Sequence, residues 1–449
     1  MPSYLLTVGM EVHVELETKT KIFCGCPNDP FESQPNSHVC PVCYGLPGAL
    51  PLLNQEAVAM TVKLGRALKG VVAEETFWAR KNYFYPDLPK GYQISQSTKP
   101  LVEKASVMID GESHLINRIH LEEDAGKLIH SADGKSSLVN FNRAGVPLVE
   151  IVTEPDFHTP EAAKRFCQEL QRIVRTLKIS AADMEKGKMR CEANISVSTT
   201  DQLGVKVEVK NINSFRAVEK AIKYEYDRQI AALEAGGKII QETRNWDDPK
   251  GKTVAMRTKE TSADYRYFPE PDLPTVEIAE EIGGEIQLPE EKRAKLVEIG
   301  LPKELIHPIV DKNGFETVVK IAESSKEKAI EAGKTLVAIP EFLLLNEHDQ
   351  IVFLALRGAN GWSKETSAEL IHKTITEKQK IEEVSKKFEH TTDLSSEVAE
   401  VIKEQAKAVA DYKAGKEPLF NFLVGQVMAK THGRANISAV REELTKQLG

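Results

Sequence analysis

The stretch Gly9-Met10-Glu11-Val12-His13-Val14-Glu15-Leu16 alternates apolar and polar side chains. This period of two predicts a β-strand with one buried face. Because successive side chains of a strand point to opposite faces, we expect Glu11, His13 and Glu15 on the other face. Two carboxylates flanking an imidazole on a rigid element suit a hard metal ion. The alternative is a strand whose polar face is simply solvated.

Further elements are predicted on both sides of this strand. We expect strands at residues 4–8, 118–121, 147–152, 193–197 and 205–210, and helices at 55–68, 160–177 and 214–235. Thr159-Pro160 is a helix-start signal, and Gly236-Gly237 is a stop signal. Strands and helices do not alternate cleanly, which favours an α+β fold over a doubly wound sheet.

The second part of the chain differs from the first. From about residue 288, charged helical patterns replace the β-branched alternation. We therefore predict a mixed-sheet domain at residues 1–287, an all-α domain at 288–390 and a small helical tail domain at 391–449.

Composition excludes several classes of protein. The chain has 449 residues and a net charge of −8, as expected for a globular protein without a general attraction to nucleic acid. Its start lacks a basic segment followed by a long apolar core, and no apolar run reaches the roughly 18 residues of a membrane span. We expect a cytoplasmic protein with no membrane partner. Residues 405–441 are locally basic, which indicates either a polyanion contact or a solvated helix face.

Four of the six cysteines form two close pairs, Cys24-x-Cys26 and Cys40-Pro-Val-Cys43. Two short pairs of thiolates are typical of a closed, tetrahedral structural zinc site, here an insertion at residues 24–43. The alternative is four buried thiols. Cys167 and Cys191 are isolated, and we expect both to be small buried residues.

Acidic side chains gather in two further segments. Glu122, Glu123 and Asp124 are consecutive at a predicted strand end, and Glu150 lies inside an apolar run. A buried carboxylate needs a cation, a proton or strong donors. A metal ion shared with Glu11 and His13 would supply the cation. A salt bridge to Arg143 or Arg190 is the alternative.

A loop at residues 80–96 combines basic, aromatic and amide side chains. Basic side chains suited to clamp phosphates are Arg80, Lys81 and Lys90, and aromatic side chains suited to stack on a base are Tyr83, Phe84, Tyr85 and Tyr92. A tyrosine-rich packed loop is the alternative, and a similar loop recurs at 264–272. The sequence Ala332-Gly333-Lys334-Thr335 is not a P-loop, because its first glycine would be residue 328, which is lysine.

Taken together, these segments resemble a known family. They include GMEVHVEL, CPVCYGLPGALPLLN, ARKNYFYPDLPKGYQISQ, RIHLEEDAGK, VNFNRAGVPLVEIVTEPD, KMRCEANISV, EVKNINSF, QETRNWDD and DYRYFPEPDLP, in order from residue 9 to residue 274. The family comprises the B subunits of the tRNA-dependent amidotransferases (GatB/GatE). The resemblance implies a catalytic cradle domain, a helical domain and a YqeY-like tail domain that binds tRNA. Residues 330–390, including Thr374–Lys380, depart from the family's pattern.

The resemblance also implies an activity. Members are ligases that phosphorylate the side-chain carboxylate of misacylated Glu-tRNA(Gln) or Asp-tRNA(Asn) with ATP. Ammonia then displaces phosphate; it comes from a glutaminase, which forms a heterotrimer with this chain and a small third protein. Whether one or both tRNAs are substrates stays open. A catalytically inactive, zinc-stapled tRNA-binding scaffold is the contrasting hypothesis.

Residue roles follow from the same resemblance. For catalysis and magnesium binding it implies Glu11, His13, Glu123 and Glu150, with Glu122 as the alternative to Glu123. For ATP it implies Arg80, Lys81, Tyr83, Lys188, Arg190, Lys210 and Asn211. For structural zinc it implies Cys24, Cys26, Cys40 and Cys43. For tRNA it implies Lys413, Lys430 and Arg434.

Overall fold

The computed structural model describes residues 4–96, 98–109, 111–131, 133–258, 265–279, 287–388 and 393–449. The chain forms two compact units, Met1–Glu290 and Glu291–Gly449. Asp264 of the second aromatic loop and the predicted boundary at 390–391 fall outside the described residues.

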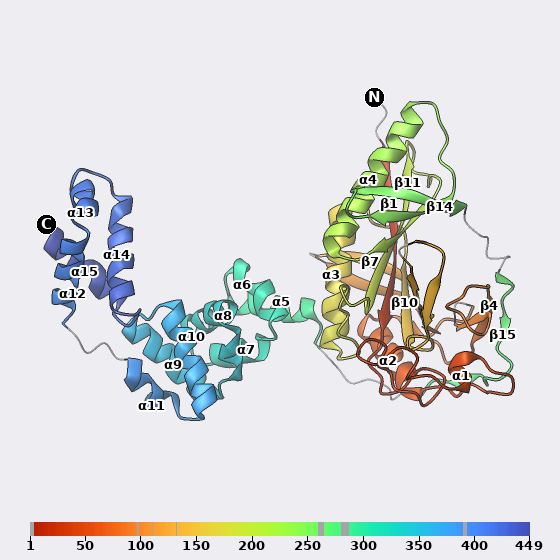
Figure 1. The fold of residues 1–449 in the computed structure, drawn as a ribbon, viewed down its shortest axis with the longest axis horizontal. Helices are drawn as coiled ribbons and strands as arrows, with labels where there is room; N and C mark the ends of the chain where they lie inside the picture. The colour runs from red at the N-terminus through yellow and green to blue at the C-terminus, as the bar shows by residue number, and fades with distance from the viewer. Residues whose placement is uncertain are drawn as a thin grey trace. The chain divides into compact units, whose positions relative to one another are not determined.

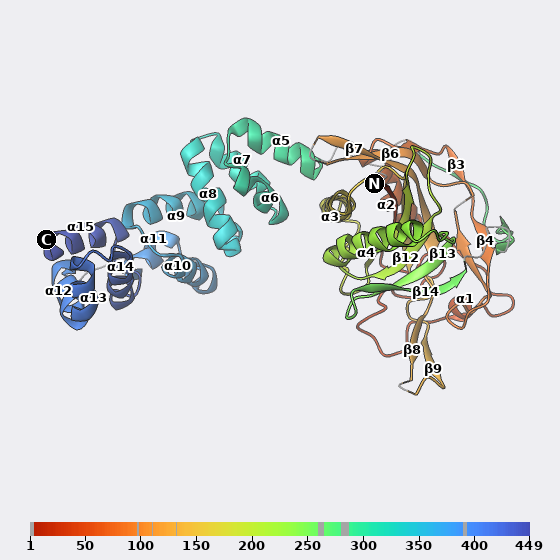
Figure 2. The same cartoon turned by 90° about the horizontal axis from the view of Figure 1, so that it is seen from above.

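One mixed sheet forms the frame of the first unit (Figures 1 and 2). Its described strands number 12, and all their pairings are antiparallel except that of β12 with β13. In order of pairing, the main path is β14 (Lys252–Thr258), β13 (Glu242–Asp247), β12 (Val207–Ile212), β11 (Met189–Ser198), β1 (Leu5–Glu15), β10 (Pro147–Thr153), β7 (Glu112–Glu123), β5 (Tyr92–Ser95), β4 (Ala79–Asn82) and β15 (Phe268–Pro269). Off this path, β6 (Val102–Ile109) pairs with β7, and β2 (Val71–Val72) pairs with β6.

Smaller elements complete this unit. Two separate ribbons pair β3 (Glu75–Thr76) with β16 (Val276–Glu277) and β8 (Lys127–His130) with β9 (Ser137–Asn140). The helices are α1 (Pro41–Tyr44), α2 (Gln55–Ala67), α3 (Pro160–Thr176) and α4 (Phe215–Glu234). Figures 1 and 2 show α3 and α4 side by side against one face of the sheet.

The alternation in the opening stretch sorts the two faces of β1. Met10, Val12 and Val14 are fully buried on the face that packs into the core of the unit. Full burial of side chains of this size contributes about 1.5–3 kcal/mol each. Glu11 and His13 consequently point to the opposite face, as the period of two predicts.

The predicted helix signals are confirmed. The Thr159 hydroxyl accepts a hydrogen bond from the Ala162 amide (3.1 Å) at the start of α3. Ser214 caps α4 in the same way through the Ala217 amide (3.1 Å). Gly236 follows the end of α4 with a positive φ of 75°, a conformation that glycine adopts without steric cost.

The second unit is helical in its described part. Its helices before residue 389 are α5 (Pro289–Ile299), α6 (Lys303–Asp311), α7 (Phe315–Ala322), α8 (Lys326–Ala338), α9 (Glu347–Asn360), α10 (Lys364–Glu377) and α11 (Ile381–Ser385), with short 3-10 turns at Pro340–Leu344 and Lys386–Phe388. The last four are α12 (Leu394–Glu404), α13 (Ala406–Lys413), α14 (Pro418–Lys430) and α15 (Ile437–Leu448). Two separate apolar clusters underlie these two sets. The α+β class is confirmed.

Candidate active site and metal centres

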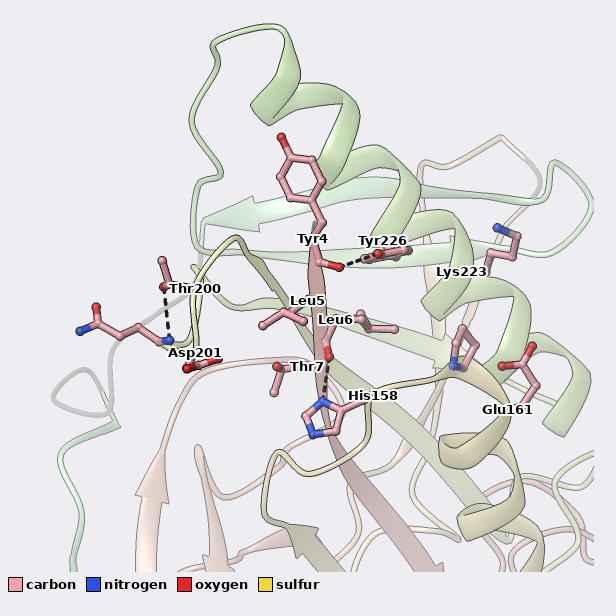
Figure 3. Close-up of a pocket in the computed structure, with 12 residues that line it drawn as sticks. Tyr4, Leu5, Leu6, Thr7, His158, Glu161, Thr200, Asp201, Lys223 and Tyr226 are labelled. Carbon is pink, nitrogen blue, oxygen red and sulfur yellow. Dashed lines mark hydrogen bonds between the residues drawn. The ribbon is translucent and has the colours of Figure 1, made fainter. Parts of the chain in front are cut away.

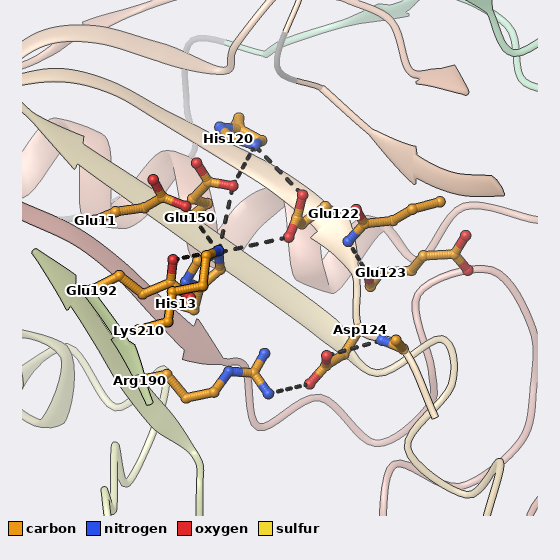
Figure 4. Close-up of polar contacts among 12 residues, drawn as sticks. Glu11, His13, His120, Glu122, Glu123, Asp124, Glu150, Arg190, Glu192 and Lys210 are labelled. Carbon is orange, nitrogen blue, oxygen red and sulfur yellow. Dashed lines mark hydrogen bonds and ion pairs between the residues drawn. The ribbon is translucent and has the colours of Figure 1, made fainter. Parts of the chain in front are cut away.

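Three titratable side chains form a row across the middle of the sheet. His13 on β1 is directly opposite Glu150 on β10, and Glu150 is directly opposite His120 on β7. A carboxylate oxygen of Glu150 lies 3.5 Å from His13 Nε2 and 3.3 Å from His120 Nε2 (Figure 4). Strand register thus places one buried carboxylate between two imidazoles.

Two more carboxylates flank this row on the same face. Glu11 lies two residues before His13, and its Oε1 is 3.8 Å from His13 Nε2. Glu122 lies two residues after His120 and is 3.9 Å from His13 Nε2 and 3.7 Å from His120 Nε2. We call Glu11, His13, His120, Glu122 and Glu150 the acid face.

The charges of the acid face shift its pKa values. Burial disfavours the charged imidazoles, but the carboxylate of Glu150 outweighs it and raises the pKa of His13 and of His120 to about 9. Burial also disfavours ionised Glu150, yet the two histidines hold the pKa of its carboxyl well below the usual range. Burial, with Glu150 and Glu192 nearby, raises the pKa of Glu11 to about 7. The face therefore carries more carboxylates than its two imidazoles can neutralise.

The donor set fits a divalent cation. Donor atoms of Glu11, His13 and Glu150 lie within 4.8 Å of one another, and so do those of His120, Glu122 and Glu150. Within the described residues, His13 Nδ1 and both ring nitrogens of His120 are buried without a hydrogen-bond partner of good geometry. Buried polar atoms are normally satisfied, so these nitrogens point to a missing ligand. Carboxylate oxygens suit magnesium or manganese.

The structure does not place Glu123 with the histidines. Its Oε1 accepts a hydrogen bond from the Ile94 amide (2.8 Å), and its Oε2 pairs with Lys90. Adjacent residues on β7 point to opposite faces, so the side chain beside His120 and Glu150 is Glu122. The sequence-based prediction named Glu123 as the magnesium ligand and Glu122 as the alternative, whereas the structure places Glu122 beside the histidines.

Arg143 and Arg190, the two arginines considered as partners of Glu150, instead form ion pairs with Asp124, which lies just beyond β7. Arg190 Nη1 lies 3.0 Å from Asp124 Oδ2, and Arg143 Nε lies 3.6 Å from the same oxygen. Burial opposes the charge of Asp124, but the two guanidinium groups lower the pKa of its carboxyl. Apart from the two histidines, the basic side chain that pairs with Glu150 is Arg118, at 3.7 Å.

Arg80 and Lys81 differ in their surroundings. Two N–H groups of Arg80 donate to the two carboxylate oxygens of Glu270, each at 2.7 Å, so this guanidinium already has a bidentate partner. Lys81 Nζ lies 4.9 Å from the centre of the Tyr265 ring. Burial disfavours its charge, but the Glu122 carboxylate outweighs it and raises the pKa of Lys81. Tyr83 packs edge-on against Tyr265.

The remaining predicted nucleotide residues lie on the β11–β12 side. Lys188 pairs with Glu17 at 2.8 Å. Lys210 Nζ lies 2.7 Å from Glu192 and 3.5 Å from Glu208. Asn211 has a positive φ of 60° where the β11–β12 register shifts, and it hydrogen-bonds to Asn245. Bulges of this kind commonly re-aim side chains next to active sites.

Sequence reasoning missed His120, Glu192 and Glu208. Glu192 and Glu208, with Glu11, form a third group whose donor atoms lie within 4.8 Å of one another. The alternation His120-Leu121-Glu122 carried a signal that His120 and Glu122 share a face. No comparable local signal marks Glu192 and Glu208, because strand pairing brings them to Glu11.

The four paired cysteines converge on one point. Cys43 Sγ lies 3.6 Å from Cys24, 3.8 Å from Cys40 and 3.8 Å from Cys26. A tetrahedral site with Zn–S distances of about 2.3 Å puts its sulfurs about 3.8 Å apart. The cluster could therefore hold a structural zinc ion. The hydrogen bond from Cys24 lowers the pKa of Cys43 to about 4, which favours the metal-binding thiolate. Cys167 and Cys191 are buried, as predicted.

The predicted tRNA residues of the tail also differ from one another. Lys430 pairs with Glu400 (2.7 Å) and Glu404 (2.8 Å). The Arg434 guanidinium lies 5.6 Å from the centre of the Phe388 ring. Lys413 is exposed at the end of α13.

A pocket of 640 Å³ lies at the start of β1, apart from the acid face (Figure 3). Its polar groups already serve internal contacts, because the Tyr226 hydroxyl donates to the Tyr4 carbonyl (3.0 Å) and His158 Nδ1 lies 2.9 Å from the Leu6 carbonyl. None of the predicted site residues lines it. In the described part of the chain, every helix is too short or too polar to cross a membrane.

Comparison with known proteins identifies the family. Residues 6–283 match the GatB/GatE catalytic domain, and residues 345–448 match the GatB domain. The second match includes much of the divergent segment 330–390. The B subunits of the aspartyl/glutamyl-tRNA(Asn/Gln) amidotransferases of Thermoanaerobacter sp. (strain X514) and Thermotoga maritima are each 42% identical to this chain, over 99% of both chains. The counterpart of the same name in Carboxydothermus hydrogenoformans is also 42% identical, over 100% of this chain and 99% of the relative. The chain therefore belongs to the family of the B subunits of aspartyl/glutamyl-tRNA(Asn/Gln) amidotransferases.

Proposed function

We propose that the acid face is the site at which misacylated Glu-tRNA(Gln) or Asp-tRNA(Asn) is amidated. In the first step, an oxygen of the side-chain carboxylate attacks the γ-phosphorus of ATP, and the bond to ADP breaks. In the second, ammonia nitrogen bonds to the acyl carbon and phosphate leaves. The observation that carries this proposal is the row His13–Glu150–His120 with Glu11 and Glu122 beside it.

The acid face alone would repel ATP. When bound, magnesium would neutralise negative charge on the phosphates of ATP. Glu11, His13 and Glu150 would hold it, and Glu122 with His120 offers a second donor group that shares Glu150. In this proposal Glu122 replaces Glu123, whose carboxylate is already bound by Lys90 and the Ile94 amide. The arrangement supplies positioning and electrostatic stabilisation, which account for most catalysis of phosphoryl transfer.

The basic residues divide into two roles. Lys81 stays charged next to Glu122 and is the best placed to contact a phosphate. Lys210, beside Glu192 and Glu208, would do so from the other side. Arg80 is a positioning residue in this proposal, because Glu270 already holds its guanidinium through two parallel hydrogen bonds.

The other residues of the predicted ATP set support the site from its margins. Arg190 would fix Asp124 at the end of β7. Tyr83 would stack beside Lys81, and Lys188 and Asn211 would border the substrate without holding the metal.

Zinc at Cys24, Cys26, Cys40 and Cys43 would be structural, because all four positions of a tetrahedron are taken by protein ligands. We further propose a cytoplasmic heterotrimer of this chain with a glutaminase and a small third protein, the family's A and C subunits. In it, residues 1–287, 288–390 and 391–449 act as cradle, helical and tRNA-binding tail domains. Lys413, Lys430 and Arg434 are the proposed tRNA contacts of the tail.

An inactive tRNA-binding scaffold is the contrasting function. It does not require a buried carboxylate between the imidazoles of His13 and His120. Nor does it require that His13 Nδ1 and both ring nitrogens of His120 are buried without a hydrogen-bond partner of good geometry. This observation supports the enzyme over the scaffold.

The deciding experiment uses this chain co-purified with its A and C subunits. We would supply Glu-tRNA(Gln) or Asp-tRNA(Asn), magnesium and γ-labelled ATP, with and without glutamine. Label on the aminoacyl side chain without glutamine, and amidated tRNA with glutamine, are the expected results. Tight tRNA binding with neither product would overturn the proposal and favour the scaffold.

A further inference from the structure

Lys21 is among the largest side chains that are completely buried in the described part of the chain, with an exposed fraction of 0%. An ammonium group out of water is costly unless an anion and hydrogen-bond acceptors compensate it. The structure gives its Nζ two such partners: Cys43 Sγ at 3.5 Å and the Phe141 carbonyl at 3.2 Å. Neither the reaction proposed above nor the four zinc ligands account for this residue.

The charge of a zinc site explains the first partner. Zinc bound by four thiolates leaves an excess of negative charge on the sulfurs. Lys21 would place a positive charge against one of them, where little water competes. Partners of this kind, outside the ligands themselves, orient a site and tune its affinity for metal.

The second partner of Lys21 Nζ, the Phe141 carbonyl, belongs to a turn that contacts the backbone at the end of β7. Phe141 begins a turn at residues 141–146, and its carbonyl also accepts from the Ala144 amide (3.1 Å). From that turn, Arg143 donates to the Ala125 carbonyl (2.9 Å), and the Gly145 amide donates to the Asp124 carbonyl (2.9 Å). The backbone that follows Glu122 and Glu123 is therefore held by the turn that Lys21 contacts.

A small cavity supports the same connection. Its lining includes the zinc ligands Cys24 and Cys43 together with Glu123 and Asp124. The zinc ligands and the end of β7 thus border the same small cavity within the first unit.

We propose that Lys21 is a positioning residue: the buried counter-cation of the zinc site and the link between that site and the turn at 141–146. The inference rests on zinc at the four cysteines and is independent of the amidation reaction. It predicts that the charge of Lys21 stabilises the zinc-bound protein selectively, since without zinc a buried ammonium loses much of its compensation.

The test compares Lys21→Met, which keeps the length and removes the charge, with Lys19→Met at an exposed position two residues earlier. Zinc content, zinc release to a chromogenic chelator and melting temperature are measured on the reduced full chain. We expect Lys21→Met to release zinc about 10–100-fold faster than wild type. Its melting temperature should fall in the zinc-bound form and not in the zinc-free form, while Lys19→Met should match wild type.

A role in packing alone would lower both melting temperatures equally and leave the release rate unchanged, and this result would overturn the proposal. Lys21→Gln, which keeps a donor for the Phe141 carbonyl, is the second variant, and zinc release at the wild-type rate would also overturn it. A wild-type chain without zinc would refute the zinc site together with this inference. Zinc in the wild type with unchanged release from both variants refutes the role of Lys21 alone.

Discussion

His13 Nε2 lies 3.5 Å from a carboxylate oxygen of Glu150, its direct neighbour across two paired strands. The position of each residue is fixed by backbone hydrogen bonds of the sheet, so little reorganisation is needed when a cation binds between them. Preorganisation of this kind is the main source of electrostatic catalysis.

Glu150→Gln tests this pair most directly. The substitution keeps the shape but removes the charge that both histidines face, so we expect amidation to fall by about 100-fold or more. Binding of tRNA should stay within about twofold, since the change is buried within the cradle. Amidation and filter binding measure the two effects. Glu103→Gln, at an exposed position on β6, is the matched control, and undiminished turnover in Glu150→Gln would refute the metal assignment.

Glu122 and Glu123 are separated by a pair of conservative variants. Glu122→Gln should lose activity with little change in stability, because Glu122 faces the histidines. Glu123→Gln leaves Lys90 without its charged partner and should cost about 1–3 kcal/mol of stability. Denaturant unfolding and amidation assays report the two properties. The reverse pattern would restore Glu123 as the ligand.

Arg80 and Lys81 should respond differently to loss of their side-chain groups. Arg80→Lys cannot form the bidentate pair with Glu270, so we expect lower stability of the loop that contains Glu270. Lys81→Met should mainly raise the KM for ATP, because it removes a charge beside the acid face. Steady-state kinetics and limited proteolysis distinguish the two. A KM change confined to Arg80→Lys would contradict this division.

Zinc should be present at about one ion per chain when the protein is kept reduced. Cys24→Ser should abolish zinc binding and lower the melting temperature, since it removes one of the four thiolates that would join the two cysteine pairs. Cys167→Ala is the control: it leaves a buried cavity but should retain the metal. Elemental analysis with thermal melts tests this, and zinc retained by Cys24→Ser would disprove the four-thiolate site.

Lys413 is the most accessible of the three tail candidates. Lys413→Ala should weaken the binding of all tRNA substrates alike. It should also reduce the slope of log K against log salt concentration by about 1, the value for one phosphate contact. Lys446→Ala serves as the control on α15. Lys430→Ala should have a smaller effect, because Glu400 and Glu404 already pair with this ammonium group. Equal salt slopes for all three variants would exclude a tail footprint at Lys413.

Local patterns predicted the elements better than they predicted the site. The helix starts at Thr159 and Ser214 could be predicted from local sequence, because an N-cap side chain bonds an amide only three residues away. Residues 4–8 and 9–16 were predicted as separate strands, but β1 runs continuously from Leu5 to Glu15 through Gly9, which packs against Pro155. Sequence spacing alone did not reveal that close approach.

The composition of the acid face depended on strand register. Glu150 was recognised because an acid in an apolar run is unusual, whereas Glu192 reaches Glu11 only through pairing of β11 with β1. The segment at 418–428 is strongly apolar, yet α14 buries Leu423, Val424 and Val427 while leaving Phe422 exposed. How far such a helix is buried depends on its neighbours, which the segment itself does not encode.

The central position of β1 sets the order in which the active site can be made. This strand leaves the ribosome long before its two partners, β10 and β11, which are at Pro147–Thr153 and Met189–Ser198. The strand that carries Glu11 and His13 therefore stays unpaired until most of the cradle domain has been synthesised. Such long-range pairing is slow and leaves exposed edges during folding. The nascent chain therefore completes its metal-binding face only after β10 and β11 have emerged, and translation that stalls before residue 189 would leave β1 as an aggregation-prone edge.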